Sequence, residues 1–141
     1  MLPPKIALFF ILLFFSIVFI QSGLDKLFDK KGNISFLMEL LGKAFKRPLI
    51  LLAFYVVTVL EILSGLLCFV GVIEILFKGT SKAGLIGMIL GSTALLVLLF
   101  GQRVAKNYEG AKTITIYFIL AMMGLVLLWF IAFAGSINFS Y

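Results

Sequence analysis

The sequence predicts an all-α fold, a four-helix transmembrane bundle with an amphipathic interfacial helix between spans 1 and 2. Of its 141 residues, 63% are apolar and 13% are charged, and the mean hydropathy is +1.24. Soluble domains carry about 45–50% apolar and about 25% charged residues. Four apolar stretches reach the roughly 20 residues that cross a bilayer, and they cover about residues 6–24, 49–73, 83–101 and 114–134. We therefore expect one integral membrane domain over residues 1–141.

The first stretch, residues 6–24, has an alternative interpretation as a secretory signal peptide. Lys5 and the apolar run after it match the basic and apolar parts of such a peptide. No A-x-A-like cleavage site follows, and Gln21-Ser22-Gly23 leads directly into charged residues. The sequence therefore favours a first span that is retained.

The connection over residues 25–47 contains a short helical pattern. Asn33 or Ser35 is suited to cap a helix that runs through Lys46. The apolar residues of one face are Phe36, Leu37, Leu40, Leu41, Ala44 and Phe45, and the other face carries Glu39, Lys43 and Lys46. We expect this amphipathic helix to lie in the membrane interface or to pack across the mouth of the bundle. Pro48 suits the first turn of the second span, where its missing N–H costs nothing.

Glu61 is the acidic residue deep within the second stretch. It follows Leu49 by 12 residues, which is about 18 Å along a helix and therefore near mid-bilayer. A charge there costs about 2.5–3.5 kcal/mol on insertion scales and usually faces the bundle interior. Thr58 and Ser64 share its helical face. Two hypotheses remain open: a ligand-binding or proton-handling carboxylate in a cavity, or a paired Glu that fixes helix packing.

Polar residues also end the first and third stretches. Gln21, Asp25 and Lys26 lie at the end of the first, and Arg103 follows the third, on the same side of the membrane in a four-span topology. The planar guanidinium of Arg103 is suited to bind a carboxylate or a phosphate. We expect either a polar mouth that leads toward Glu61, or ordinary interfacial charge at the lipid headgroups.

The third stretch carries three glycines at helical spacing, Gly84, Gly87 and Gly91. Small residues let helix backbones approach closely in lipid, where no hydrophobic force drives association. These glycines therefore predict a packing face, used inside the bundle or against a partner protein.

The distribution of Lys and Arg predicts the orientation. The N-terminus, the second connection and the C-terminal tail hold three of them: Lys5, Lys78 and Lys82. The first and third connections hold nine: Lys26, Lys30, Lys31, Lys43, Lys46, Arg47, Arg103, Lys106 and Lys112. The positive-inside rule then places both termini on the periplasmic side of a bacterial inner (cytoplasmic) membrane. The net charge of +6 is expected to contact anionic lipid and not nucleic acid.

The composition also restricts the chemistry. The chain has no histidine and one cysteine, Cys68, so haem ligation by His and a dithiol redox pair are excluded. Cys68 is expected to be a small buried apolar residue. We expect no catalytic residue, no metal site and no intrinsic cofactor, and the sequence disfavours an enzyme that acts alone.

Short motifs resemble the DoxX family. They are Gly23-Leu24-Asp25-Lys26 at the end of the first span and Glu-x-x-x-Gly from Glu61 to Gly65. Gln21-Ser22-Gly23 and Arg103 with Glu109-Gly110-Ala111 are similar to its Bacteroidetes-type members. The resemblance covers nearly the whole chain. It implies a relation to the small membrane subunit of archaeal thiosulfate:quinone oxidoreductase and to membrane oxidoreductase assemblies. The cysteine pairs of the distantly similar vitamin K epoxide reductase bundles are missing here, as is a soluble thiosulfate-binding domain.

We therefore expect an accessory or anchoring subunit of a membrane, redox-linked complex, with membrane lipids and another membrane protein as partners. The alternative is a small-molecule site in the bundle, where a quinone- or lipid-like ligand lies near Glu61 with Thr58 and Ser64. A channel or transporter is disfavoured, because the sequence shows no inverted repeat and one deep charge.

Overall fold

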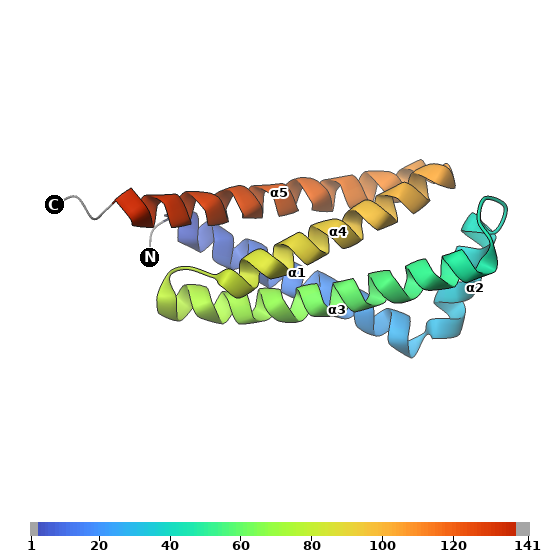
Figure 1. Ribbon diagram of the computed structural model, residues 1–141, viewed down its shortest axis with the longest axis horizontal. Helices are drawn as coiled ribbons and strands as arrows, with labels where there is room; N and C mark the ends of the chain where they lie inside the picture. Colours follow the sequence, from blue (N-terminus) through green and yellow to red (C-terminus); the bar gives the residue numbers. More distant parts are fainter. Residues whose placement is uncertain (1–2, 138–141) are drawn as a thin grey trace.

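The computed structural model describes residues 3–137, which form five helices and no strand (Figure 1). In chain order they are α1 (Pro3–Phe28), α2 (Lys30–Leu41), α3 (Arg47–Lys78), α4 (Lys82–Val104) and α5 (Tyr108–Ile137). Four of them, α1, α3, α4 and α5, are long and apolar enough to cross a membrane. The all-α, four-span fold is confirmed, and the protein is a multi-pass membrane protein.

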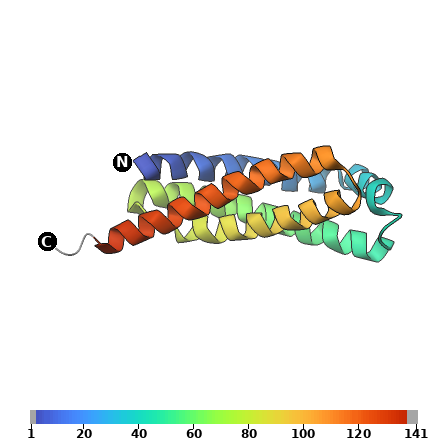
Figure 2. The same cartoon turned by 90° about the horizontal axis from the view of Figure 1, so that it is seen from above.

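The four long helices run alternately up and down the bundle (Figures 1 and 2). Both ends of the described chain lie at one end of the bundle, and α2 lies at the other with the α4–α5 connection. The most extensive packing joins α3 to α1 and to α4, while α5 packs on α4 and α1. Buried aromatic and aliphatic side chains fill the centre, among them Leu8, Leu12, Phe15, Phe19 and Met88.

Each long helix extends beyond the apolar stretch that predicted it. The predicted spans 49–73 and 114–134 become Arg47–Lys78 and Tyr108–Ile137. Helical hydrogen bonds continue into polar residues until a capping signal ends them. Gly79 ends α3 with φ of 73° in the left-handed region, and its N–H bonds to Ile75 O. Ser81 begins α4 by accepting a hydrogen bond from the Gly84 N–H at 2.8 Å.

The boundaries predicted for the short helix are wrong at both ends. Its N-cap is Asp29, and not Asn33 or Ser35, because the Asp29 carboxylate accepts the N–H of Gly32 at 3.2 Å. The helix also ends at Leu41 instead of continuing through Lys46.

Pro48 keeps α2 and α3 from forming one continuous helix. Lys46 adopts an extended conformation with φ of −70° and ψ of 149°, and it is the N-cap of α3. Pro48 lies in the first turn of α3, as predicted. A proline inside one continuous helix would remove a hydrogen bond and clash with the preceding turn, so the chain breaks and starts a new helix. Whether α2 lies in the membrane interface stays a prediction.

Close contacts fix the register of α1 against α3. A Cβ on Gly23 would overlap the Ile62 side chain, and a Cβ on Gly65 would come within 2.8 Å of the Ile20 backbone nitrogen. In this antiparallel register the last residue of α1, Phe28, lies level with position 57 of α3. Because α3 begins ten residues earlier, at Arg47, it extends about 15 Å beyond the end of α1. We call this segment, residues 47–57, the α3 overhang.

The glycines of α4 lie against other helices of the same chain. A Cβ on Gly84 would meet Ser81 Oγ and the Leu12 side chain of α1. A Cβ on Gly87 would come within 2.9 Å of the Cys68 backbone nitrogen in α3, and one on Gly91 would overlap Phe19 of α1. The predicted packing face is therefore used inside the bundle.

Candidate functional site

An ion pair buried between α1 and α3 forms the centre of the site. Glu61 is 2% exposed, and its Oε2 lies 2.9 Å from Lys26 Nζ. Ser22 Oγ donates a hydrogen bond to Glu61 Oε1 at 3.1 Å and accepts one from Lys26 Nζ at 2.9 Å. The Nζ–Oε2 contact is electrostatic, since Oε2 has no well-aligned hydrogen bond from any described residue. We call these three residues the Ser22–Lys26–Glu61 cluster.

The local sequence of α1 accounts for this cluster. Ser22 and Lys26 are four residues apart and therefore lie on one helical face. Gly23 beside them has no side chain, so α1 approaches α3 closely at Ile62. The long apolar stem of Lys26 carries its ammonium group back along the helix to Glu61. Burial of a carboxylate among apolar helices is tolerated because a cation and a hydroxyl both contact it.

A partly open cavity lies beside this cluster, between α2, the α3 overhang and the C-terminal part of α4. Its volume is about 350 Å³, at the lower end of the roughly 300–1,000 Å³ typical of small-molecule sites. Side chains of α2 and its following turn line one side: Asn33, Phe36, Leu37, Leu40, Leu41 and Phe45. The α3 overhang contributes Leu49, Ile50, Ala53, Phe54 and Val57, and α4 contributes Val97, Leu98, Phe100, Gly101 and Gln102.

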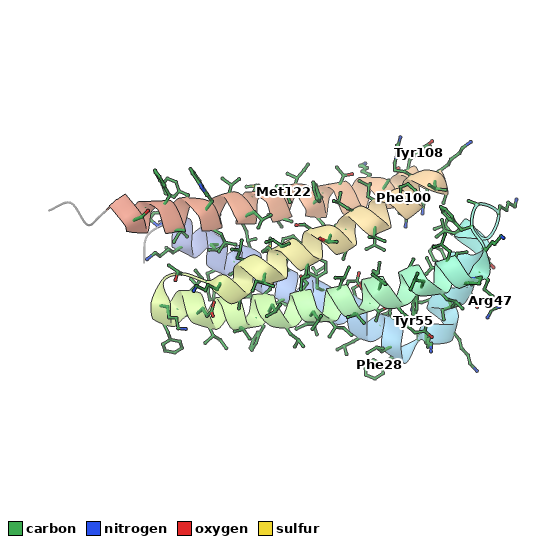
Figure 3. All side chains as sticks on the ribbon, in the orientation of Figure 1. Phe28, Arg47, Tyr55, Phe100, Tyr108 and Met122 are labelled. Atoms are coloured by element: carbon green, nitrogen blue, oxygen red, sulfur yellow. The ribbon has the colours of Figure 1, made fainter. Side chains whose placement is uncertain are left out.

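The α3 overhang explains why the cavity exists. α1 ends before this level of the bundle, so it does not fill the space between α3 and α4 there. The 12-residue helix α2 covers the gap from the side and contacts both α3 and α1. In Figure 3 Phe100 and Arg47 lie at this end of the bundle.

Three polar residues face this apolar cavity: Lys26, Asn33 and Gln102. Asn33 is already engaged, since its Nδ2 donates to Asp29 O at 2.8 Å. Lys26 is the charged residue among the described lining residues. In the antiparallel register it lies level with position 59 of α3, just beyond the overhang, so this residue lies at the inner end of the cavity.

The hydroxyls of Thr58 and Ser64 do not contact Glu61. Thr58 Oγ1 donates to Phe54 O at 2.6 Å, and Ser64 Oγ donates to Gly87 O at 2.6 Å. Both residues are buried, as expected from their face of α3. Because both hydroxyls donate to backbone carbonyls, these two side chains stabilise the helix interior and are not directed at a ligand beside Glu61.

The predicted polar mouth does not form as a unit, because its residues point in different directions. Gln21 and Asp25 lie on an exposed face of α1, and only Lys26, about 100° further round the helix, reaches Glu61. The Arg103 guanidinium lies 5.0 Å from the centre of the Tyr108 ring, at the α2 end of the bundle (Figure 3). Arg103 is exposed there.

Two parts of the site were not assigned from the sequence. From the sequence, Ser22 was given no role beyond the end of the first span. Its four-residue spacing from Lys26 indicates that the two residues share a helical face. The cavity depends on the α3 overhang, and therefore on the register of α1 against α3. Apolar stretches predict which segments form helices, but not the register of one helix against another.

Comparisons with protein-family models, with curated proteins and with solved structures found no match to this chain. The resemblance to the DoxX family stays a prediction that depends on the short motifs alone. The geometry of the cluster and the cavity is the basis for a functional proposal.

Proposed function

We propose that this protein binds one lipid-soluble molecule in the cavity beneath α2. The observation that carries the proposal is an apolar space of about 350 Å³ lined at its inner end by the partly buried Lys26, whose ammonium is paired with Glu61. Small-molecule sites combine a largely apolar wall with a few polar groups that orient the ligand. A quinone- or lipid-like compound fits this description, because its apolar body matches the walls and its polar head reaches Lys26.

Filling the cavity is expected to abolish this binding. Ala53, half-buried on the α3 overhang, lines the cavity, so Ala53→Phe would place a ring inside it. We expect native mass spectrometry of the protein in mild detergent to show a bound small molecule on the wild type. We expect Ala53→Phe to retain at most about one tenth of it, a loss of at least about 1.4 kcal/mol in binding free energy.

The matched control for this experiment is Ala132→Phe on an exposed face of α5. It adds the same ring to a membrane-facing position and should leave the bound molecule in place. Equal occupancy in Ala53→Phe and the wild type would contradict the proposal, as would a wild-type protein that carries no small molecule.

We further propose that the α2 end faces the cytoplasm of a bacterial cell, so that the cavity opens toward the inner leaflet. The support is the excess of Lys and Arg at this end, nine against three at the opposite end. Lys30 Nζ lies 4.8 Å from the centre of the Tyr55 ring there, and tyrosine beside a cation is typical of a membrane–water interface.

Cysteine labelling tests this orientation. Ser35 in α2 and Thr80 in the α3–α4 connection are both exposed. Cys68 is 0% exposed and should not react with the label. In intact spheroplasts, a membrane-impermeant maleimide should label Thr80→Cys and spare Ser35→Cys until the membrane is opened. The reverse pattern would place the cavity on the outer side.

A further inference from the structure

We propose that the cavity selects ligands whose polar head is a neutral carbonyl-type acceptor and discriminates against anionic heads. This inference rests on the proposed function, because it specifies which molecule the cavity beneath α2 holds. It follows from the hydrogen-bond capacity and the charge of the Ser22–Lys26–Glu61 cluster.

Lys26 has a donor left for a ligand. Its ammonium carries three N–H groups. Ser22 Oγ accepts a hydrogen bond from Lys26 Nζ at 2.9 Å, and Glu61 Oε2 lies 2.9 Å from the same nitrogen as its ion-pair partner. The side chain is 15% exposed and lines the cavity. At least one N–H is therefore available to an acceptor atom that enters the cavity, and this donor favours a carbonyl over a purely hydrocarbon molecule.

Glu61 determines the charge that such a ligand meets. Its carboxylate, 2.9 Å from Lys26 Nζ, neutralises the ammonium within the cluster. An anionic head placed on Lys26 would gain one positive charge and face one negative charge a few ångströms further on, in surroundings that screen charge poorly. It would also lose its own hydration on entering an apolar space. A neutral carbonyl avoids both penalties.

Two other cations near this end of the bundle do not add charge to the cavity lining. Among the described lining residues, Lys26 alone is charged. The neighbouring cations Lys30 and Arg103 lie over the rings of Tyr55 and Tyr108, outside the lining. They attract anionic lipid to the surface of the protein, and the cavity itself stays close to neutral.

Binding of two matched probes tests the inference. The probes are a long-chain methyl ester and the alkyl sulfonate of equal chain length, since a sulfonate stays ionised. Each is titrated into the wild-type protein in nanodiscs of zwitterionic lipid. We expect the ester to bind at least about tenfold more tightly, the size of one charge-assisted hydrogen bond. An alkyl benzoquinone serves as a second neutral probe. Tighter binding of the benzoquinone would indicate a quinone as the natural ligand, and tighter binding of the methyl ester would indicate an ester lipid.

Glu61→Gln should invert this preference. It removes the negative charge and leaves the ammonium uncompensated, so the sulfonate should gain at least about tenfold over the ester. The double variant Lys26→Met/Glu61→Gln removes both charges and the lysine donor. It should bind both probes more weakly than the wild type and still bind the ester more tightly, because the sulfonate loses its hydration in the cavity. If Glu61→Gln does not fold, the wild-type comparison alone decides.

The possible failures are distinguishable. If the wild type binds none of the probes and Ala53→Phe changes nothing, the proposed function is wrong. If the wild type binds probes in the cavity but binds the sulfonate as tightly as the ester, the proposed function is supported and this inference is overturned. Unchanged selectivity in a folded Glu61→Gln variant also overturns it.

Discussion

Replacing Lys26 by Met should lower the free energy of unfolding by about 3–5 kcal/mol, which is the cost of removing one partner of a buried ion pair. Glu61 is 2% exposed, and this substitution leaves its carboxylate among apolar helices with only the Ser22 hydroxyl as a partner. Reversible unfolding in mixed micelles, with increasing dodecyl sulfate and followed by circular dichroism, measures the loss.

Two further variants make this result specific to the pair. Lys31→Met removes an exposed lysine from α2 and should change stability little. Lys26→Met/Glu61→Gln removes both charges and should recover most of the loss, because no unpaired charge stays buried. A loss in Lys26→Met no larger than in Lys31→Met would mean that the ion pair does not stabilise the bundle.

The second large effect is expected at the contact between α3 and α4. A Cβ on Gly71 would come within 2.7 Å of the Gly84 Cα, which is backbone and cannot move aside. Gly71→Ala should therefore separate the two helices and cost about 1–3 kcal/mol, although alanine is the better helix former. The same micelle unfolding experiment measures it.

Gly135→Ala is the matched control, because nothing lies within 4 Å of a Cβ at Gly135 in α5. That variant should be unchanged, or more stable by up to about 1 kcal/mol from helix propensity. If both alanine variants gain stability, the close approach of α3 and α4 at Gly71 is not a feature of the folded protein.

The fold could be predicted from the sequence because lipid imposes a simple rule. Long apolar stretches must become helices there, since every backbone polar group needs an internal partner. The four spans followed from this rule. The place of Pro48 in α3 followed from its missing N–H, which the first turn of a helix does not need. The N-terminal end of α2 was wrong because several residues competed as the N-cap, and Asp29 cannot be distinguished from Asn33 by residue type.

The candidate site was predicted less completely. Glu61 and Lys26 could be selected because charges next to or within apolar stretches are rare and costly. Their pairing, and the engagement of Thr58 and Ser64 with backbone carbonyls, depend on how the helices pack together. The roles as a DoxX-like protein and as an accessory subunit stay predictions. The glycine face that suggested a partner is covered by α1 and α3 of the same chain.

The buried ion pair also has a consequence for biogenesis. Glu61 leaves the translocon within α3, but the cation that pairs with it, Lys26, belongs to the earlier helix α1. Because α1 precedes α3 and the two pack directly, Lys26 is already in the membrane when Glu61 arrives. Formation of the α1–α3 hairpin can therefore accompany synthesis, before α4 and α5 emerge from the ribosome. The Glu61 carboxylate is costly in an isolated helix. In this order of events, its attraction to Lys26 favours the packing of α3 on α1.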